Sequence, residues 1–181
     1  MLNTRALFAT LALVLAFSGA SRAQSAFTSP TIDVGVVVTD ISKSVKFYTE
    51  VLGFKELPGF KVPAPFASDA GLTEGKPLDI KVLVLGEGAG ATKLKLMEIL
   101  GAKPAQSKQK VIESQTGFRY LTLMVADTRA SVERATKAGA KPIAKGSLAI
   151  PQDIAPGMFL TIYQDPDGNF IELVGPMSVK D

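Results

Sequence analysis

The stretch Gln164-Asp165-Pro166-Asp167-Gly168-Asn169-Phe170-Ile171-Glu172-Leu173 predicts a β-hairpin near the end of the chain. It begins with Asp at the first, Pro at the second and Gly at the fourth position, which is the pattern of a type I turn. Residues 159–163 and 170–174, on either side, are rich in β-branched and aromatic side chains. Glu172 stands between two apolar residues, and alternate residues of a strand face opposite sides of a sheet. Its carboxylate therefore lies either on a solvated sheet face or in a binding site.

The composition is that of an ordinary globular protein, with 46% hydrophobic and 20% charged residues in a chain of 181. The chain contains no His and no Cys. It therefore has no disulfide, no Ser-His-Asp triad and no zinc site of the usual nitrogen and sulfur type. The predicted mature chain is close to neutral and has no basic stripe, which argues against a nucleic-acid partner.

The first 23 residues have the features of a secretory signal peptide. Arg5 precedes an apolar run over residues 6–17, which is too short for a permanent membrane span, and Ser21-Arg22-Ala23 has the small-x-small pattern of a cleavage site. We predict cleavage after Ala23, a periplasmic or secreted mature protein, and no membrane association after cleavage.

The remaining chain reads as strand-helix-strand-strand-strand, twice. Strands are predicted over residues 32–38, 54–60, 80–85, 92–100, 118–125 and 141–150 and in the final hairpin. Helices are predicted over residues 41–52 and from a cap at Asp127 or Thr128 to residue 138, and a loop over residues 61–79. The predicted units are 1–23 (signal peptide), 24–30 (lead-in), 31–101 (first module), 102–116 (linker), 117–176 (second module) and 177–181 (tail).

An internal repeat supports this division. Asp40, followed by Ser44 and Val45, recurs 87 residues later as Asp127, followed by Ser131 and Val132. A glycine ends each predicted helix, as expected for a left-handed C-terminal residue. In the strand before each helix, alternate apolar residues align, so the residues between them face the other side of the sheet.

These motifs resemble the vicinal-oxygen-chelate superfamily, which includes glyoxalase I, bleomycin- and fosfomycin-resistance proteins and extradiol dioxygenases. The resemblance rests on residues 36–40, Phe47-Tyr48-x-x-Val51-Leu52-Gly53-Phe54 and the turn with its Glu172 strand. It implies an α+β fold in which two βαβββ modules form a curved mixed sheet around a central cleft. The modules either pair within one chain or exchange between the two chains of a homodimer.

The resemblance also places four cleft positions, which hold a metal ion in metal-using members, on Asp33, Lys95, Tyr120 and Glu172. An ammonium cannot donate a lone pair while it is charged and repels a divalent cation. We therefore expect no metal cofactor, with Lys95 in the metal's place bridging Asp33 and Glu172. The alternative is that the two carboxylates and the phenol hold a hard cation such as Mg²⁺ or Mn²⁺.

Strand alternation extends the predicted cleft lining, which is mostly apolar as in small-molecule pockets. Those residues instead fill a second core if no ligand binds. With Phe60 and Phe66 from a loop that would cover the cleft, the predicted ligand-binding residues are Asp33, Val37, Phe60, Phe66, Lys95, Met97, Tyr120, Thr122, Met124, Phe159, Thr161, Tyr163 and Glu172.

Two functions follow. The first, which we prefer, is metal-free binding of a small, mostly apolar molecule, in the manner of drug-sequestering members of the superfamily. The second is a glyoxalase-type lyase or isomerase, in which Glu172 or Asp33 is the general base and Lys95, or a weakly held divalent metal, stabilises an enolate-like charge. A structural domain without a ligand is a third reading.

Overall fold

The computed structural model describes residues 29, 31–88, 90–105 and 110–179. The predicted signal peptide, its cleavage site and most of the lead-in lie outside these residues. Within the described ranges, no helix combines the length and the apolar character needed to cross a bilayer.

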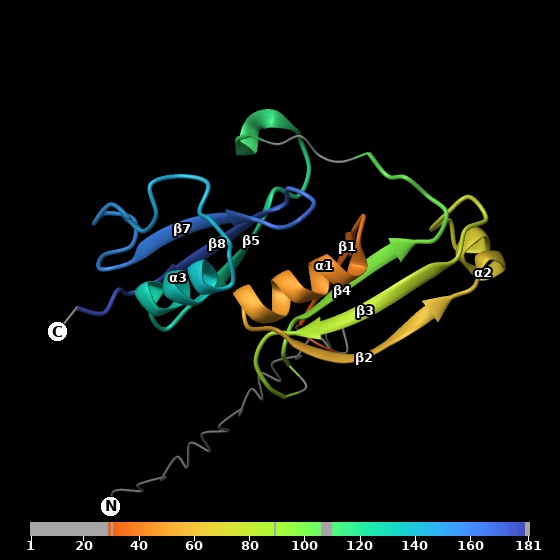
Figure 1. The fold of residues 1–181 in the computed structure, drawn as a ribbon, viewed down its shortest axis with the longest axis horizontal. Helices are drawn as coiled ribbons and strands as arrows, with labels where there is room; N and C mark the ends of the chain where they lie inside the picture. Colours follow the sequence, from red (N-terminus) through yellow and green to blue (C-terminus); the bar gives the residue numbers. More distant parts are fainter. Residues whose placement is uncertain (1–28, 30, 89, 106–109, 180–181) are drawn as a thin grey trace, which may run out of the picture.

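The strands form two separate four-stranded sheets, each built from one half of the chain (Figure 1). The strand orders are β1-β4-β3-β2 and β5-β8-β7-β6. In both sheets the first strand pairs in parallel with the last strand of its half, and the other pairs are antiparallel. The predicted α+β architecture of two βαβββ modules is confirmed, with two mixed sheets in place of one. The strands are β1 (Asp33–Val37), β2 (Lys55–Val62), β3 (Leu78–Val84), β4 (Lys93–Ile99), β5 (Tyr120–Met124), β6 (Leu148–Ala149), β7 (Phe159–Gln164) and β8 (Phe170–Gly175).

An aspartate begins the main helix of each module, as the repeat predicted. Asp40 accepts a hydrogen bond from the Lys43 amide at 3.0 Å and Asp127 accepts one from the Arg129 amide at 2.9 Å, which satisfies amide groups that a helix start leaves unpaired. Gly53 and Gly139 follow these helices with φ of 84° and 83°. The helical segments are α1 (Ile41–Lys46), η1 (Phe47–Val51, a π-helical turn), α2 (Ala64–Asp69), η2 (Ile112–Ser114, a 3₁₀ turn) and α3 (Thr128–Lys137).

The two modules share one hydrophobic core. It lies on the helix-covered side of both sheets and includes Tyr48, Leu96, Leu123, Tyr163 and Leu173, all of them buried. α1 and α3 lie on the same side of the molecule in Figure 1, and α3 contacts η1. Both sheets therefore keep their opposite faces free of the main helices.

Three sequence predictions differ from the structure. The predicted loop 61–79 contains α2, where Pro63 is the N-cap and Pro65 lies in the first turn, a place that suits proline because it needs no amide donor. The predicted strand 141–150 shrinks to β6, because Gly146 has a positive φ and the chain bends before it. The predicted helix 41–52 changes from α to π geometry after Lys46.

Candidate ligand-binding face

The strand register shows which side chains share the face of the first sheet opposite α1, called here the open face. Directly paired residues lie on the same side of a sheet. From one end of the sheet to the other, the open face consists of four rows: Lys55–Val84–Lys93–Asp33, Leu57–Val82–Lys95–Gly35, Phe60–Ile80–Met97–Val37 and Val62–Leu78–Ile99. The rows pass from charged to apolar, so the face is amphipathic along the strands.

Asp33 and Lys95 form an ion pair on this face. Lys95 Nζ lies 2.8 Å from Asp33 Oδ2, and the two side chains are 35% and 38% exposed. The hydrogen bond from Lys95 is the main reason that the pKa of Asp33 lies below its ordinary value, with a smaller electrostatic contribution from Lys93. Asp33 is therefore ionised near neutrality. Because the pair is partly solvated, it belongs with surface ion pairs of small energetic value, not with buried ones.

The α2 helix covers the apolar end of the open face over β2 and β3, while Met97 and Ile99 on β4 stay partly exposed. Ala67 is fully buried against Val62, Leu78 and Ile80. Phe66 on the same helix is 62% exposed, and Phe60 in the neighbouring strand is 49% exposed. The segment that was expected to cover the site therefore packs on the sheet, but these two predicted ligand-binding rings are available to solvent.

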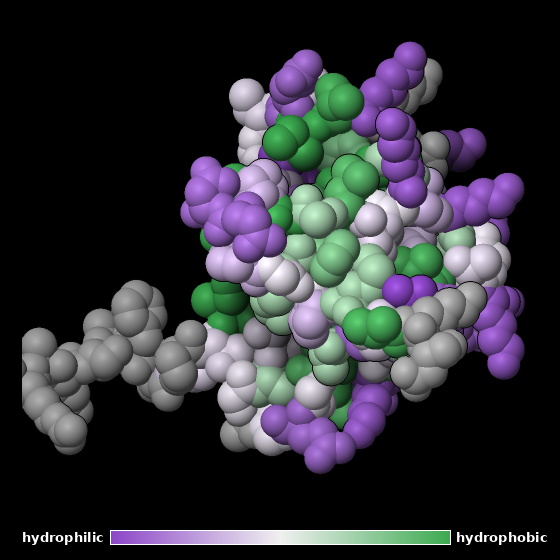
Figure 2. Space-filling model, turned by 90° about the vertical axis from the view of Figure 1, so that its left-hand side faces the viewer, coloured by the Kyte–Doolittle hydropathy of each residue, from purple (hydrophilic) through white to green (hydrophobic). Residues whose placement is uncertain are grey.

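On the second sheet, Glu172 shares its face with Tyr120, Thr122 and Met124, as predicted. Thr122 Oγ1 donates a hydrogen bond to Glu172 Oε2 at 2.8 Å. Tyr120 and Met124 are 49% and 67% exposed. Seen from the end of the molecule that carries the second module, Figure 2 shows hydrophobic residues gathered along a central band with hydrophilic side chains on either side.

The predicted placement of Phe159, Thr161 and Tyr163 beside Glu172 is wrong. In the hairpin Glu172 pairs with Ile162, so the other face of β7 carries these three residues. Thr161 is 1% exposed and its Oγ1 lies 2.8 Å from Ser147 Oγ, while Tyr163 is fully buried in the shared core. The open side of β7 carries Leu160, Ile162 and Gln164 instead.

The predicted bridge by Lys95 is found on one side only. Lys95 pairs with Asp33, but among the described residues no ion pair joins it to Glu172, which is held by Thr122. Lys93 and Thr122 line the same hollow of about 130 Å³ between β4 and β5. Lys93 lies next to Asp33 in its row and Thr122 binds Glu172, so the first-sheet and second-sheet site residues approach the same junction. In the described part of the chain, no ion pair joins the two groups.

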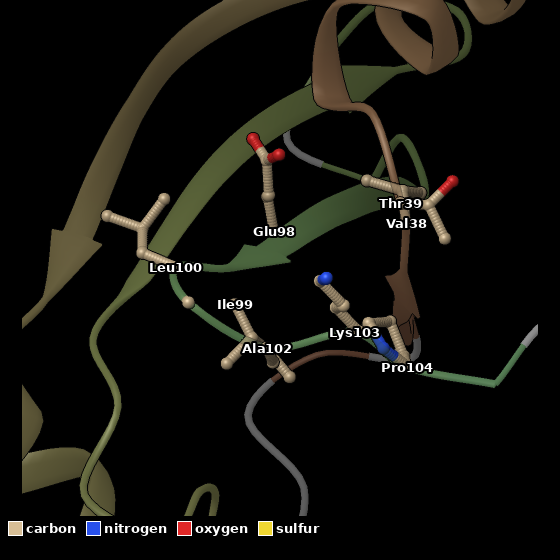
Figure 3. A pocket seen from close by; sticks show the side chains of 9 residues that line it. Val38, Thr39, Glu98, Ile99, Leu100, Ala102, Lys103 and Pro104 are labelled. Atoms are coloured by element: carbon tan, nitrogen blue, oxygen red, sulfur yellow. The ribbon is translucent and has the colours of Figure 1, made fainter.

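A second hollow, of about 360 Å³, lies at the end of β4 and carries none of the predicted site residues (Figure 3). Most of its wall residues are apolar or glycine, and three are polar: the lining is Val38, Thr39, Glu98, Ile99, Leu100, Gly101, Ala102, Lys103 and Pro104. In Figure 3, Ile99 and Glu98 point to opposite sides of β4, with Ile99 on the side of Ala102. Ile99 also belongs to the last row of the open face, whereas Val38 and Glu98 lie on the opposite face, so this hollow meets the open face at the end of β4.

The donor set at the four cleft positions does not suit a divalent metal. An ammonium lies 2.8 Å from the Asp33 carboxylate, where it neutralises the charge that would attract a cation. In the described part of the chain, no group of three or more acidic, His or Cys side chains is arranged to hold a metal ion. Metal independence itself stays a prediction.

The turn at Asp165–Gly168 joins the two modules, a role that the sequence did not reveal. Asp165, only 5% exposed, accepts a hydrogen bond from the Tyr48 hydroxyl at 2.9 Å. Asp167 accepts hydrogen bonds from the amide and the hydroxyl of Thr39. The sequence predicts a type I turn here, and the Gly168 amide does donate a hydrogen bond to the Asp165 carbonyl. The side chains of the two aspartates also fix the hairpin that carries Glu172 against the first module.

Comparison with known proteins agrees with this architecture. A profile of the Glyoxalase/Bleomycin resistance protein/Dioxygenase superfamily matches residues 32–173, and the chain belongs to this superfamily. A search of curated proteins found no match.

Solved structures show the same fold at low sequence identity. A glyoxalase family protein from Bacillus cereus has a TM-score of 0.67 at 18% identity, over 86% of this chain and 100% of that one. Glyoxalase I from Zea mays has a TM-score of 0.59 at 20% identity, over 81% of this chain and 44% of the maize chain. A glyoxylase/bleomycin resistance protein/dioxygenase domain from Frankia sp. EAN1pec has a TM-score of 0.57 at 21% identity, over 80% and 94% of the two chains.

Proposed function

We propose that this protein binds a small, mostly apolar molecule on the open face of its first sheet, without a metal ion. The observation that carries the proposal is the Asp33–Lys95 ion pair standing beside exposed apolar side chains of the next row, above all Val37. A face built to bind a divalent cation would concentrate unpaired carboxylates, whereas this one pairs its carboxylate with an ammonium.

The geometry supports binding more than catalysis. Asp33 is engaged by Lys95, and Glu172 accepts a hydrogen bond from Thr122, so both candidate bases already have partners. The pKa of Asp33 lies below its ordinary value, away from the neutral range that suits a general base. The apolar rows supply contact area, which is the usual source of affinity for apolar ligands.

The test uses the neutral fluorescent reporter N-phenyl-1-naphthylamine with the purified protein. We expect saturable binding that Val37→Glu weakens at least about tenfold, because the new carboxylate loses solvation when the reporter covers it. Ile154→Glu is the matched control, since Ile154 is also exposed but belongs to neither sheet. Equal weakening by both substitutions, or binding that neither affects, would refute the proposed site.

Two further measurements separate the alternatives. Elemental analysis of protein purified without chelators should find well under one metal ion per chain. Turnover of the hemithioacetal of methylglyoxal and glutathione, lost in Glu172→Gln, would favour the lyase over the binding protein.

A further inference from the structure

We infer that the ligand is an amphipathic acid: one anionic group held by Lys93 and Lys95, and an apolar chain that runs along β4 into the hollow beside Ile99. This inference rests on the proposed function and adds the charge, the orientation and the length of the ligand. Three independent features of the open face support it.

The first feature is the charge at one end of the face. The two charged rows of the open face contain three ammonium groups and one carboxylate. Lys55 pairs with Glu87 at 2.8 Å and Lys95 with Asp33 at 2.8 Å. No described residue forms an ion pair with Lys93, which is exposed next to Asp33 in the same row. One positive charge is therefore left for a ligand anion, and Lys95 lies one row away to provide a second donor.

The second feature is the apolar path that begins next to Lys95. Val37 and Met97 form the following row on β1 and β4, and Gly35 beside Lys95 adds no side chain that would separate the charged row from the apolar one. The space that a Cβ on Gly35 would enter is occupied by the end of the Met97 side chain, whose Cε would lie 3.0 Å from it. Val37 is 41% exposed and Met97 is half-buried. A chain bound here would cover apolar surface that is now in contact with water.

The third feature is the hollow where the path ends. From Lys95 to Ile99 the strand advances about 13 Å, at about 3.3 Å per residue. Ile99 then forms part of the wall of the 360 Å³ hollow, together with Leu100 and Ala102 (Figure 3). Lys103 and Glu98 also line the hollow, so its wall is mixed and not wholly apolar. This volume falls within the range of small-molecule sites, roughly 300–1,000 Å³. The site thus suits a medium-length chain whose far end leaves the sheet.

The experiment compares ligands with one decyl chain and different head groups, by calorimetry below their micellar concentrations. We expect decanoate to bind about tenfold more tightly than decanol, as for a hydrogen bond to a charged group. Lys93→Gln or Lys95→Gln should remove most of this advantage. Lys81→Gln is the matched control, because Lys81 lies in the same sheet on the opposite face, beside Glu56.

Chain length tests the path. Affinity should rise about three- to fourfold per methylene from hexanoate to decanoate, the gain expected for burying each group. Ala102→Trp, which narrows the hollow, should weaken decanoate and leave hexanoate unchanged. Equal weakening of both, in a variant whose melting temperature is unaltered, would contradict the path.

Other outcomes decide between this inference and the proposed function. Equal affinity of decanol and decanoate, or tighter binding of decyltrimethylammonium, would overturn the anionic head group and leave apolar binding intact. If no decyl compound binds while the neutral reporter binds in a Val37-dependent way, only the amphipathic acid is refuted. If the reporter also fails to bind, the proposed function fails as well.

Discussion

The hydrogen bond between Tyr48 and Asp165 can be tested by removing one oxygen atom. The Tyr48 ring is fully buried, and its hydroxyl donates to Asp165 Oδ2 at 2.9 Å. Burial, reinforced by the charge of Asp165, raises the pKa of Tyr48, so the hydroxyl keeps its proton. Asp165 also accepts from the Asp167 amide and from the amide and side chain of Asn169, and it therefore keeps three donors in Tyr48→Phe.

A hydrogen bond to a charged group contributes about 1.5–3 kcal/mol. Because the carboxylate keeps its other donors, we expect Tyr48→Phe to lower the free energy of unfolding by about 2 kcal/mol. The melting temperature would then fall by about 4–8 °C for a domain of this size. Urea unfolding followed by circular dichroism, together with a thermal melt, measures both quantities.

Tyr163→Phe is the matched comparison, since Tyr163 is also fully buried. Within the described chain its hydroxyl has no hydrogen-bond partner, and a buried hydroxyl without a partner costs about 1–3 kcal/mol. Removing it should leave the protein unchanged or stabilise it by up to about 1 kcal/mol. A Tyr48→Phe variant as stable as Tyr163→Phe would show that the bond to Asp165 contributes nothing to the joining of the modules.

Three further predictions concern charge, metal and backbone. The pKa values of Asp33, Asp40 and Asp127 in the folded state lie below the ordinary 3.8. Their contribution to stability is therefore complete above pH 3.8 and is lost as the pH falls through the folded-state pKa values. An unfolding free energy that stays constant on acidification through this range would contradict their pairing. Lys95→Glu should bind Mn²⁺ more tightly in a calorimetric titration, because it adds a carboxylate beside Asp33. If the affinity does not rise, position 95 and Asp33 do not share a face. Gly59 lies where the pairing of β2 with β3 shifts register, between Leu57 and Phe60. Gly59→Ala should destabilise the protein by about 2 kcal/mol or more, since its Cβ would lie 2.2 Å from the Ile80 carbonyl oxygen. Unchanged urea unfolding would show that this irregular part of β2 shifts to accommodate the methyl group.

Much of the fold follows from local sequence signals. Asp40 predicts one helix start and Asp127 or Thr128 the other, because short polar side chains suit the first free amides. The structure shows the bonds from Asp40 and Asp127. The family resemblance, extended by strand alternation, correctly predicts that Glu172 shares a face with Thr122: the two residues are direct partners in the parallel pair of β5 and β8.

The errors arise where tertiary packing decides between two similar patterns. Both faces of β7 carry apolar residues, so composition cannot tell whether Tyr163 or Ile162 faces the core. The register is set by the hairpin loop, which pairs Gln164 with Phe170 and so places Ile162 opposite Glu172. Likewise, the bond from Tyr48 to Asp165 joins residues 117 positions apart, and no local motif indicates it.

That long separation has a consequence for how the chain folds. The strand pairs lie within single modules, whereas the bonds of Asp165 and Asp167 to the first module close loops of more than a hundred residues. Contacts between distant residues carry a larger entropic cost of loop closure, so we expect each module to form its sheet before the turn docks. Loss of these bonds should then accelerate unfolding while leaving the refolding rate almost unchanged. The turn would form last and slow unfolding, because it holds the two folded modules together.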